Sequence, residues 1–146
     1  PNGNFEGGAI GWKIPSGGMG EITAVQAGAG TFSLRIRDES EEKGSSILSP
    51  RFPLRERRDY QLRGIARHLD GRGLGVYVRF YDAEGRAILE LKEEGHLGSL
   101  KPEEEWEEFP FFFEGQPEAA FARVLLHSYN SAELDVLIDD LVVEED

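Results

Sequence analysis

The sequence contains no cysteine, a single methionine and only three histidines. The lack of cysteine excludes disulfide bonds, thiol catalysis and metal sites built on thiolates. No apolar stretch approaches the roughly 20 residues that a membrane-spanning helix needs. His68, His96 and His127 are far apart in the sequence and show none of the spacings typical of metal ligands. His96, in the stretch EEGHLG, is expected in a loop.

Basic residues are also scarce, with 16 Lys and Arg against 28 Asp and Glu and a net charge of −12. This balance disfavours general binding to nucleic acid or to an anionic membrane, because phosphate contacts need a basic footprint. An acidic chain fits solubility and, more weakly, the binding of cations.

Signatures of catalysis are missing as well. The sequence has no GxSxG, HExxH, P-loop or dinucleotide motif. A glycosidase needs two carboxylates held at a defined separation across a cleft. The acidic runs at 41–42, 93–94 and 103–105 look like solvated loop charge instead. We therefore expect a protein that is not an enzyme.

What the sequence does contain is an apolar pattern with a period of two, which is typical of half-buried β-strands. The clearest examples predict strands at 31–37, 60–69, 75–82, 121–129 and 133–145. Weaker candidates are 21–26, 45–52, 86–93 and 108–115. Turn residues at 70–73 and 82–85 separate strands of this set.

No segment predicts a long helix; 100–109 fits either one short helical turn or a loop that leads into a strand. Many short strands at a spacing near ten residues predict an all-β antiparallel sandwich. Residues 1–146 show no repeat and no linker, so we expect one domain. The chain begins at Pro1 without a Met, which is typical of a module cut from a longer protein and leaves open whether a signal sequence preceded it. We expect a secreted or cell-surface location.

Four segments taken in order resemble carbohydrate-binding modules of the family four and nine type. They are NGNFEGGAIGW near the start, GTFSLRIR, RDYQLRGIARHL and the closing VLIDDLVVEE. The resemblance covers residues 2 to 145. It implies a jelly-roll sandwich of the galactose-binding-like class that binds polysaccharide without catalysis. It also implies a linked polysaccharide-degrading enzyme as partner.

The resemblance further implies a structural calcium ion where the two chain ends meet. Calcium prefers six to eight oxygen ligands, a mixture of carboxylates and backbone carbonyls. The matching positions are the Glu6 carboxylate, a carbonyl of Gly3 or Asn4, the Thr31 carbonyl, and a carboxylate of Asp139 or Asp140.

Of the two aspartates we favour Asp139, because it has the parity of Leu137 and Leu141 and is expected to point inward. A buried carboxylate without a cation is costly. Related modules often carry an acidic side chain just before the Thr31 position, whereas 26–30 here has none. The alternative is that Glu6 and Asp139 only accept hydrogen bonds from backbone amides at strand ends.

A sugar ring stacks its apolar face on an exposed aromatic and bonds its hydroxyl rim to planar polar groups. The segment 75–82 alternates aliphatic residues with Tyr77, Arg79 and Tyr81, which therefore share the outer face of the predicted sheet. The family resemblance implies that the strands carrying Arg63, Arg67, Arg123 and His127 are adjacent to this one, and on that basis we expect all seven side chains to line one concave face.

The sequence leaves open whether the ligand is a neutral or an anionic polysaccharide. The resemblance to these modules favours a neutral β-glucan, xylan or mannan. The arginines favour an anionic polysaccharide, because Arg forms bidentate hydrogen bonds to carboxylate or sulfate. Outer-face arginines also pair with cross-strand glutamates, in which case the sandwich is a structural or protein-interaction domain.

Three further aromatic predictions follow. Trp12 is expected to pack under the first strands rather than bind sugar. Of the cluster at 109–113, Phe109, Phe111 and Phe113 are expected in the core, because consecutive residues of a strand cannot all point inward. Phe112 is expected either on the surface or under a loop.

Overall fold

The computed structural model describes residues 6, 11–14, 20–23, 32–38, 45–55, 57–71, 73–88, 96–100, 104–128 and 134–145, which form two antiparallel β-sheets. The strands are β1 (Gly20–Thr23), β2 (Ser33–Asp38), β3 (Ser45–Leu48), β4 (Phe52–Pro53), β5 (Asp59–Gly71), β6 (Gly75–Tyr81), β7 (His96–Ser99), β8 (Glu107–Glu114), β9 (Phe121–Ser128) and β10 (Leu134–Glu145). The described residues include no helix long and apolar enough to cross a membrane.

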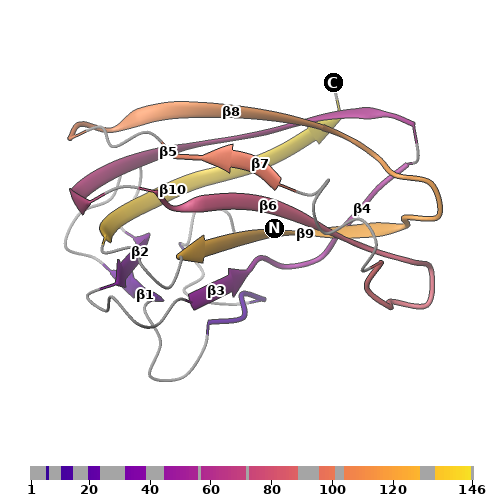
Figure 1. Ribbon diagram of the computed structural model, residues 1–146, viewed down its shortest axis with the longest axis horizontal. Helices are drawn as coiled ribbons and strands as arrows, with labels where there is room; N and C mark the ends of the chain where they lie inside the picture. The colour runs from indigo at the N-terminus through magenta and orange to yellow at the C-terminus, as the bar shows by residue number, and fades with distance from the viewer. Residues whose placement is uncertain are drawn as a thin grey trace.

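The two sheets lie face to face as the layers of a sandwich (Figure 1). We call the first the back sheet; its strand order is β1-β2-β10-β5-β8. We call the second the front sheet; its order is β3-β9-β6-β7, and β4 also pairs with β9. In the back sheet the last strand, β10, pairs with β2, which lies in the first third of the sequence.

The core fills the space between the sheets and follows from the alternation in the sequence. Leu34, Ile36 and Val136 of the back sheet and Val76 and Leu126 of the front sheet are all essentially inaccessible to solvent. Trp12 is buried in the same cluster, as predicted. Burial of large aliphatic side chains of this kind contributes about 1.5–3 kcal/mol for each residue.

Most of the strand predictions are confirmed. Each of the five strong candidates is a strand, and the weaker ones at 21–26, 45–52 and 108–115 contain β1, β3 with β4, and β8. Residues 89–93 of the remaining candidate lie outside the described part of the chain, although Ala87 forms an isolated bridge to Tyr81. Residues 104–106 of the charged segment form a bend that leads into β8, not a helix.

Two local expectations are wrong. His96, expected in a loop, is the first residue of β7, which pairs with the edge of β6. Leu137 and Leu141 do not share a face, because β10 changes register against β5 between Asp139 and Val142, where Asp140 has a positive φ of 50°. This β-bulge leaves Leu137 on the outer side, opposite Arg67, and turns Leu141 toward the core.

Candidate functional site

The outer face of β6 carries the stripe that the alternation predicts. Val76, Val78 and Phe80 are buried, whereas Arg79 is exposed and the rings of Tyr77 and Tyr81 are half-buried. The strand therefore divides its side chains between the core and the outer face of the front sheet.

Strand β9 lies beside β6 and extends the same face. Arg79 is directly opposite Arg123, and Tyr77 is directly opposite Leu125. His127 is opposite Gly75, which has no side chain to cover it. The structure thus brings together five of the predicted side chains: Tyr77, Arg79, Tyr81, Arg123 and His127.

Several contacts hold these side chains in place. The rings of Tyr77 and His127 meet edge to face, with centroids 6.2 Å apart and an interplanar angle of 86°. Nδ1 of His127 is hydrogen-bonded to the Ser46 hydroxyl at 2.7 Å. Arg123 donates to the Ser49 carbonyl at 2.8 Å, and its guanidinium carbon lies 5.9 Å from the centroid of the Tyr81 ring.

Two residues of this face were not among the predicted ones. Phe121 is the cross-strand partner of Tyr81, and the guanidinium carbon of Arg51 lies 4.3 Å from the centroid of the Phe121 ring. The parity of Phe121 with Arg123 was visible in the sequence. The position of Arg51 was not, because it depends on how the segment between β3 and β4 runs alongside β9.

Arg63 and Arg67 do not belong to this face, so the expectation of a single face with seven side chains is wrong. Both lie on the outer side of β5, in the back sheet. Arg63 forms an ion pair with Glu144 at 2.6 Å, and Nε of Arg67 donates to the Glu104 carbonyl at 2.8 Å. The alternation placed them correctly on an outward side, but β5 pairs with β10 and β8 rather than with β6.

Of the predicted metal ligands, the described residues are Glu6, Asp139 and Asp140; Gly3, Asn4 and Thr31 lie outside the described part. The Glu6 carboxylate accepts a hydrogen bond from the Phe32 amide at 2.7 Å, just before β2. Asp139 is fully buried, and its Oδ1 accepts from the Asp140 amide at 2.8 Å.

These carboxylates lie at the same end of one strand pair, because the pairing of β2 with β10 ends at Leu34 and Ile138, one residue before Asp139. The argument that Asp139 points inward because it alternates with Leu137 and Leu141 is wrong, since the bulge puts these two leucines on different faces. The Asp139 side chain is nevertheless fully buried. No group of three or more Asp, Glu or His side chains is gathered among the described residues.

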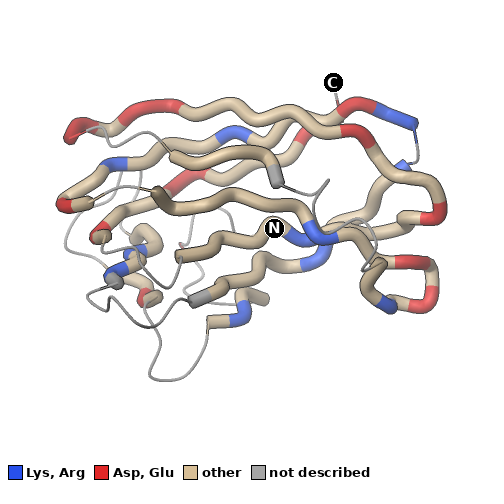
Figure 2. Tube along the Cα trace, in the orientation of Figure 1, with Lys and Arg blue, Asp and Glu red and all other residues tan. Residues whose placement is uncertain are grey.

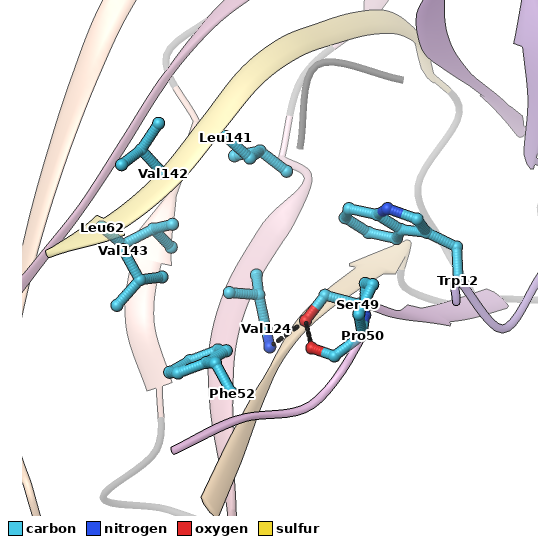
Figure 3. A pocket seen from close by; sticks show the side chains of 9 residues that line it. All are labelled: Trp12, Ser49, Pro50, Phe52, Leu62, Val124, Leu141, Val142 and Val143. Carbon is cyan, nitrogen blue, oxygen red and sulfur yellow. Dashed lines mark hydrogen bonds between the residues drawn. The ribbon is translucent and has the colours of Figure 1, made fainter. Parts of the chain in front are cut away.

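A pocket of about 180 Å³ opens between the two sheets (Figure 3). Trp12, Ser49 and Pro50 lie on one side of it and aliphatic residues of β10 on the other. The Ser49 hydroxyl accepts from the Val124 amide at 2.8 Å and donates to the Pro50 carbonyl at 2.9 Å. The Ser49 hydroxyl is thus satisfied within the protein, and the other side chains that line the pocket are apolar. Such a lining suits a gap in the core better than a site for a polar ligand.

A second pocket, of about 420 Å³, lies where β7 and β8 form the open side of the sandwich. Glu107 and Glu108 line it together with Phe109 and Phe111. The two glutamates are consecutive on one strand and both are exposed, so they do not face each other across the space. This arrangement differs from the opposed pair of a glycosidase.

No family model matches the sequence, and no curated protein matches it. Solved structures do match the fold. The enzymatically active domain of bacteriophage CBA120 tailspike protein 4 has a TM-score of 0.77 at 12% identity, over 100% of this chain and 21% of that chain. A family 16 carbohydrate-binding module has a TM-score of 0.66 at 18% identity, over 99% of this chain and 98% of its own.

A family 61 carbohydrate-binding module in complex with β-1,4-galactotriose is similar as well, with a TM-score of 0.60 at 15% identity, over 99% of this chain and 96% of that one. Modules of families 4 and 22 are among the similar structures. The chain has the jelly-roll fold of these modules. The structural likeness extends over several module families rather than to the family four and nine type alone.

Proposed function

We propose that this domain is a non-catalytic carbohydrate-binding module and that its glycan site is the outer face of the front sheet. One observation carries the proposal. Tyr77 and Tyr81 stand on the same outer side of β6, and Phe121 lies directly opposite Tyr81 on β9. The similar structures support a saccharide ligand, since they include a xylan-binding domain and a module in complex with a galactotriose.

The residues of this face suit a sugar chain laid along it. The aromatic rings offer apolar surface for the C–H faces of the sugar. Arg79, Arg123 and His127 offer nitrogen donors for its oxygen atoms. Because an open face removes little surface from water, we expect affinity for a single chain to be modest.

The same proposal extends to the context of the domain. It would keep a linked polysaccharide-degrading enzyme close to its polymer, outside the cell. The specific kinship with families four and nine rests on the order and spacing of the four sequence segments that resemble those modules.

A calcium ion would stabilise the end of the sandwich where Glu6 and Asp139 lie. The donor chemistry fits, because a fully buried carboxylate at this end favours a compensating cation. Asp139 and Glu6 would supply the carboxylate ligands, and Asp140 is the alternative to Asp139.

The proposal is tested by affinity electrophoresis of the 146-residue chain in gels that contain a panel of neutral and acidic polysaccharides. A carbohydrate-binding module is retarded by at least one polymer and releases no reducing ends from it. Normal migration with every polymer would instead favour a structural or protein-interaction domain, and release of reducing ends would favour an enzyme.

A further inference from the structure

Two arginines stand directly opposite one another on the glycan face of the proposed module. Arg79 of β6 and Arg123 of β9 are cross-strand partners, and both side chains point outward. Like charges in directly opposed positions destabilise a sheet. Among the described residues, no Asp or Glu forms an ion pair with either of them.

The distribution of acidic residues between the two sheets explains this. The described strands of the front sheet, with sequences SSIL, FP, GVYVRFY, HLGS and FARVLLHS, contain no Asp or Glu. Each strand of the back sheet contains at least one. In a chain with 28 acidic residues, the described strands of the front sheet therefore place no carboxylate of their own beside Arg79 and Arg123.

Arginines of the back sheet show the contrast. Arg35 is paired with Asp135 at 2.6 Å, and Arg63 with Glu144 at the same distance. On the front sheet the basic segments of β6 and β9 lie close together (Figure 2). Among the described residues, Arg35 and Arg63 of the back sheet are thus neutralised by carboxylates of the protein itself, whereas Arg79 and Arg123 of the front sheet are not.

A third guanidinium adjoins the pair. Arg51 stacks on Phe121, the cross-strand partner of Tyr81, while Arg123 lies near the Tyr81 ring. Gly85 lies close to the first of these guanidinium groups, since a Cβ at that position would be 3.3 Å from Nη1 of Arg51. Two aromatic rings are thus flanked by guanidinium groups, which is an arrangement that fits a sugar ring bearing a negative substituent.

From this arrangement we infer that the ligand is an anionic glycan, whose carboxylate or sulfate group binds between Arg79 and Arg123. The inference rests on the proposed function and specifies its substrate class. A carboxylate of a uronic acid and a sulfate ester share the chemistry that matters here, namely two or more anionic oxygens that accept from guanidinium N–H groups. Such an anion converts the repulsion between Arg79 and Arg123 into attraction for a shared partner.

The experiment uses affinity electrophoresis with two matched pairs of polymers. Polygalacturonate is compared with its methyl ester, and dextran sulfate with dextran. We expect the charged member of at least one pair to retard the chain more than the neutral member does. Polygalacturonate alone identifies a carboxylate, and dextran sulfate alone identifies a sulfate ester. Retardation is expected to fall with added salt, because screening weakens charge–charge attraction.

The matched variants are Arg79→Gln and Arg63→Gln, which make the same change in net charge on opposite sheets. Loss of one charge-assisted hydrogen bond is expected to raise the dissociation constant of Arg79→Gln about tenfold. Arg63→Gln is expected to bind as the parent chain does. The melting temperature of Arg79→Gln is expected to be unchanged or slightly raised without ligand, because a like-charge contact is removed.

The outcomes separate the inference from the function on which it rests. Equal retardation by charged and neutral members of both pairs overturns the inference and leaves the proposed function standing. So does an equal loss of binding in both variants. Normal migration with these polymers and with the whole panel overturns both.

Discussion

The guanidinium carbon of Arg123 lies 5.9 Å from the centroid of the Tyr81 ring, while the same side chain donates a 2.8 Å hydrogen bond to the Ser49 carbonyl. The carbonyl belongs to the segment that follows β3, so three parts of the sequence converge at this contact. Because Arg123 is held before any ligand arrives, less conformational freedom is lost on binding. Tyr81 and Arg123 therefore form a prearranged pair at the centre of the proposed site.

Gly64 is required by packing inside β5. A Cβ at this position would lie 2.8 Å from Cζ of Phe109 and 2.9 Å from Cδ2 of Leu141. We expect Gly64→Ala to lower the free energy of unfolding by about 1–3 kcal/mol, as in other overpacked cores. Urea denaturation of both chains measures the difference, and equal midpoints would show that the core accommodates the methyl group.

Two ion pairs of the back sheet are expected to differ in their contribution to stability. Asp135 accepts from both Nε and Nη2 of Arg35, at 2.9 and 2.6 Å, and both side chains are mostly buried. Glu144 accepts from Arg63 in an exposed pair. We expect Asp135→Asn to cost about 1.5–3 kcal/mol, and Glu144→Gln about 0–1 kcal/mol. Chemical denaturation measures the free energy of unfolding of both variants. A loss in Glu144→Gln as large as the loss in Asp135→Asn would contradict the prediction.

Asp82 organises the turn after β6 and gives a pH-dependent prediction. Its Oδ1 accepts from the amides of Arg86 and Glu84, at 2.9 and 3.0 Å. The hydrogen bond from the Arg86 amide is the largest cause that lowers the pKa of Asp82 below its ordinary 3.8. The ionised form is thus favoured in the folded state, so its contribution is complete above pH 3.8 and is lost as the pH falls through the lowered pKa.

Melting curves of the parent chain and Asp82→Asn across this range check the sign. The parent chain is expected to be the more stable at neutral pH, and the difference is expected to shrink in acid, where Asp82 is protonated. A difference that stays constant down to strong acid would contradict the role of the ionised carboxylate.

A bound calcium ion predicts a response to chelation. If free calcium is about a hundred times its dissociation constant, binding stabilises the fold by about 2.7 kcal/mol, and a chelator lowers the melting temperature accordingly. Glu6→Gln is expected to lose most of this response, because it removes a proposed carboxylate ligand. An identical melting curve with and without chelator in the parent chain would count against the metal and would favour hydrogen bonding to the amides of Phe32 and Asp140 alone.

The alternation of apolar and polar residues predicted most of the fold, because this pattern is a local property of each strand. The burial of Val76, Val78 and Phe80 followed from their spacing, and of the two positions expected for Phe112 the structure has the surface one, since this side chain is 62% accessible. Strand β7 was missed because only Leu97 of its four residues is a large apolar side chain. Its strand conformation comes from pairing with β6, which is a long-range contact.

The candidate site was only partly predictable for the same reason. Alternation states which side of a strand a residue faces, but not which sheet the strand joins, so Arg63 was grouped with Tyr77 although β5 lies in the back sheet. The bulge at Asp140 was not predicted either, because residues other than glycine seldom adopt a positive φ and no glycine marks the position. Parity therefore failed to predict the direction of Asp139.

The most direct test compares Tyr81→Ala with Phe112→Ala in affinity gels that contain a polymer bound by the parent chain. Both variants remove one aromatic ring from an outward position, Tyr81 on the front sheet and Phe112 on the back sheet. The account predicts that Tyr81→Ala migrates almost freely, whereas Phe112→Ala is retarded as strongly as the parent. Full retardation of Tyr81→Ala, or its loss in Phe112→Ala alone, would contradict the assignment of the glycan site to the front sheet.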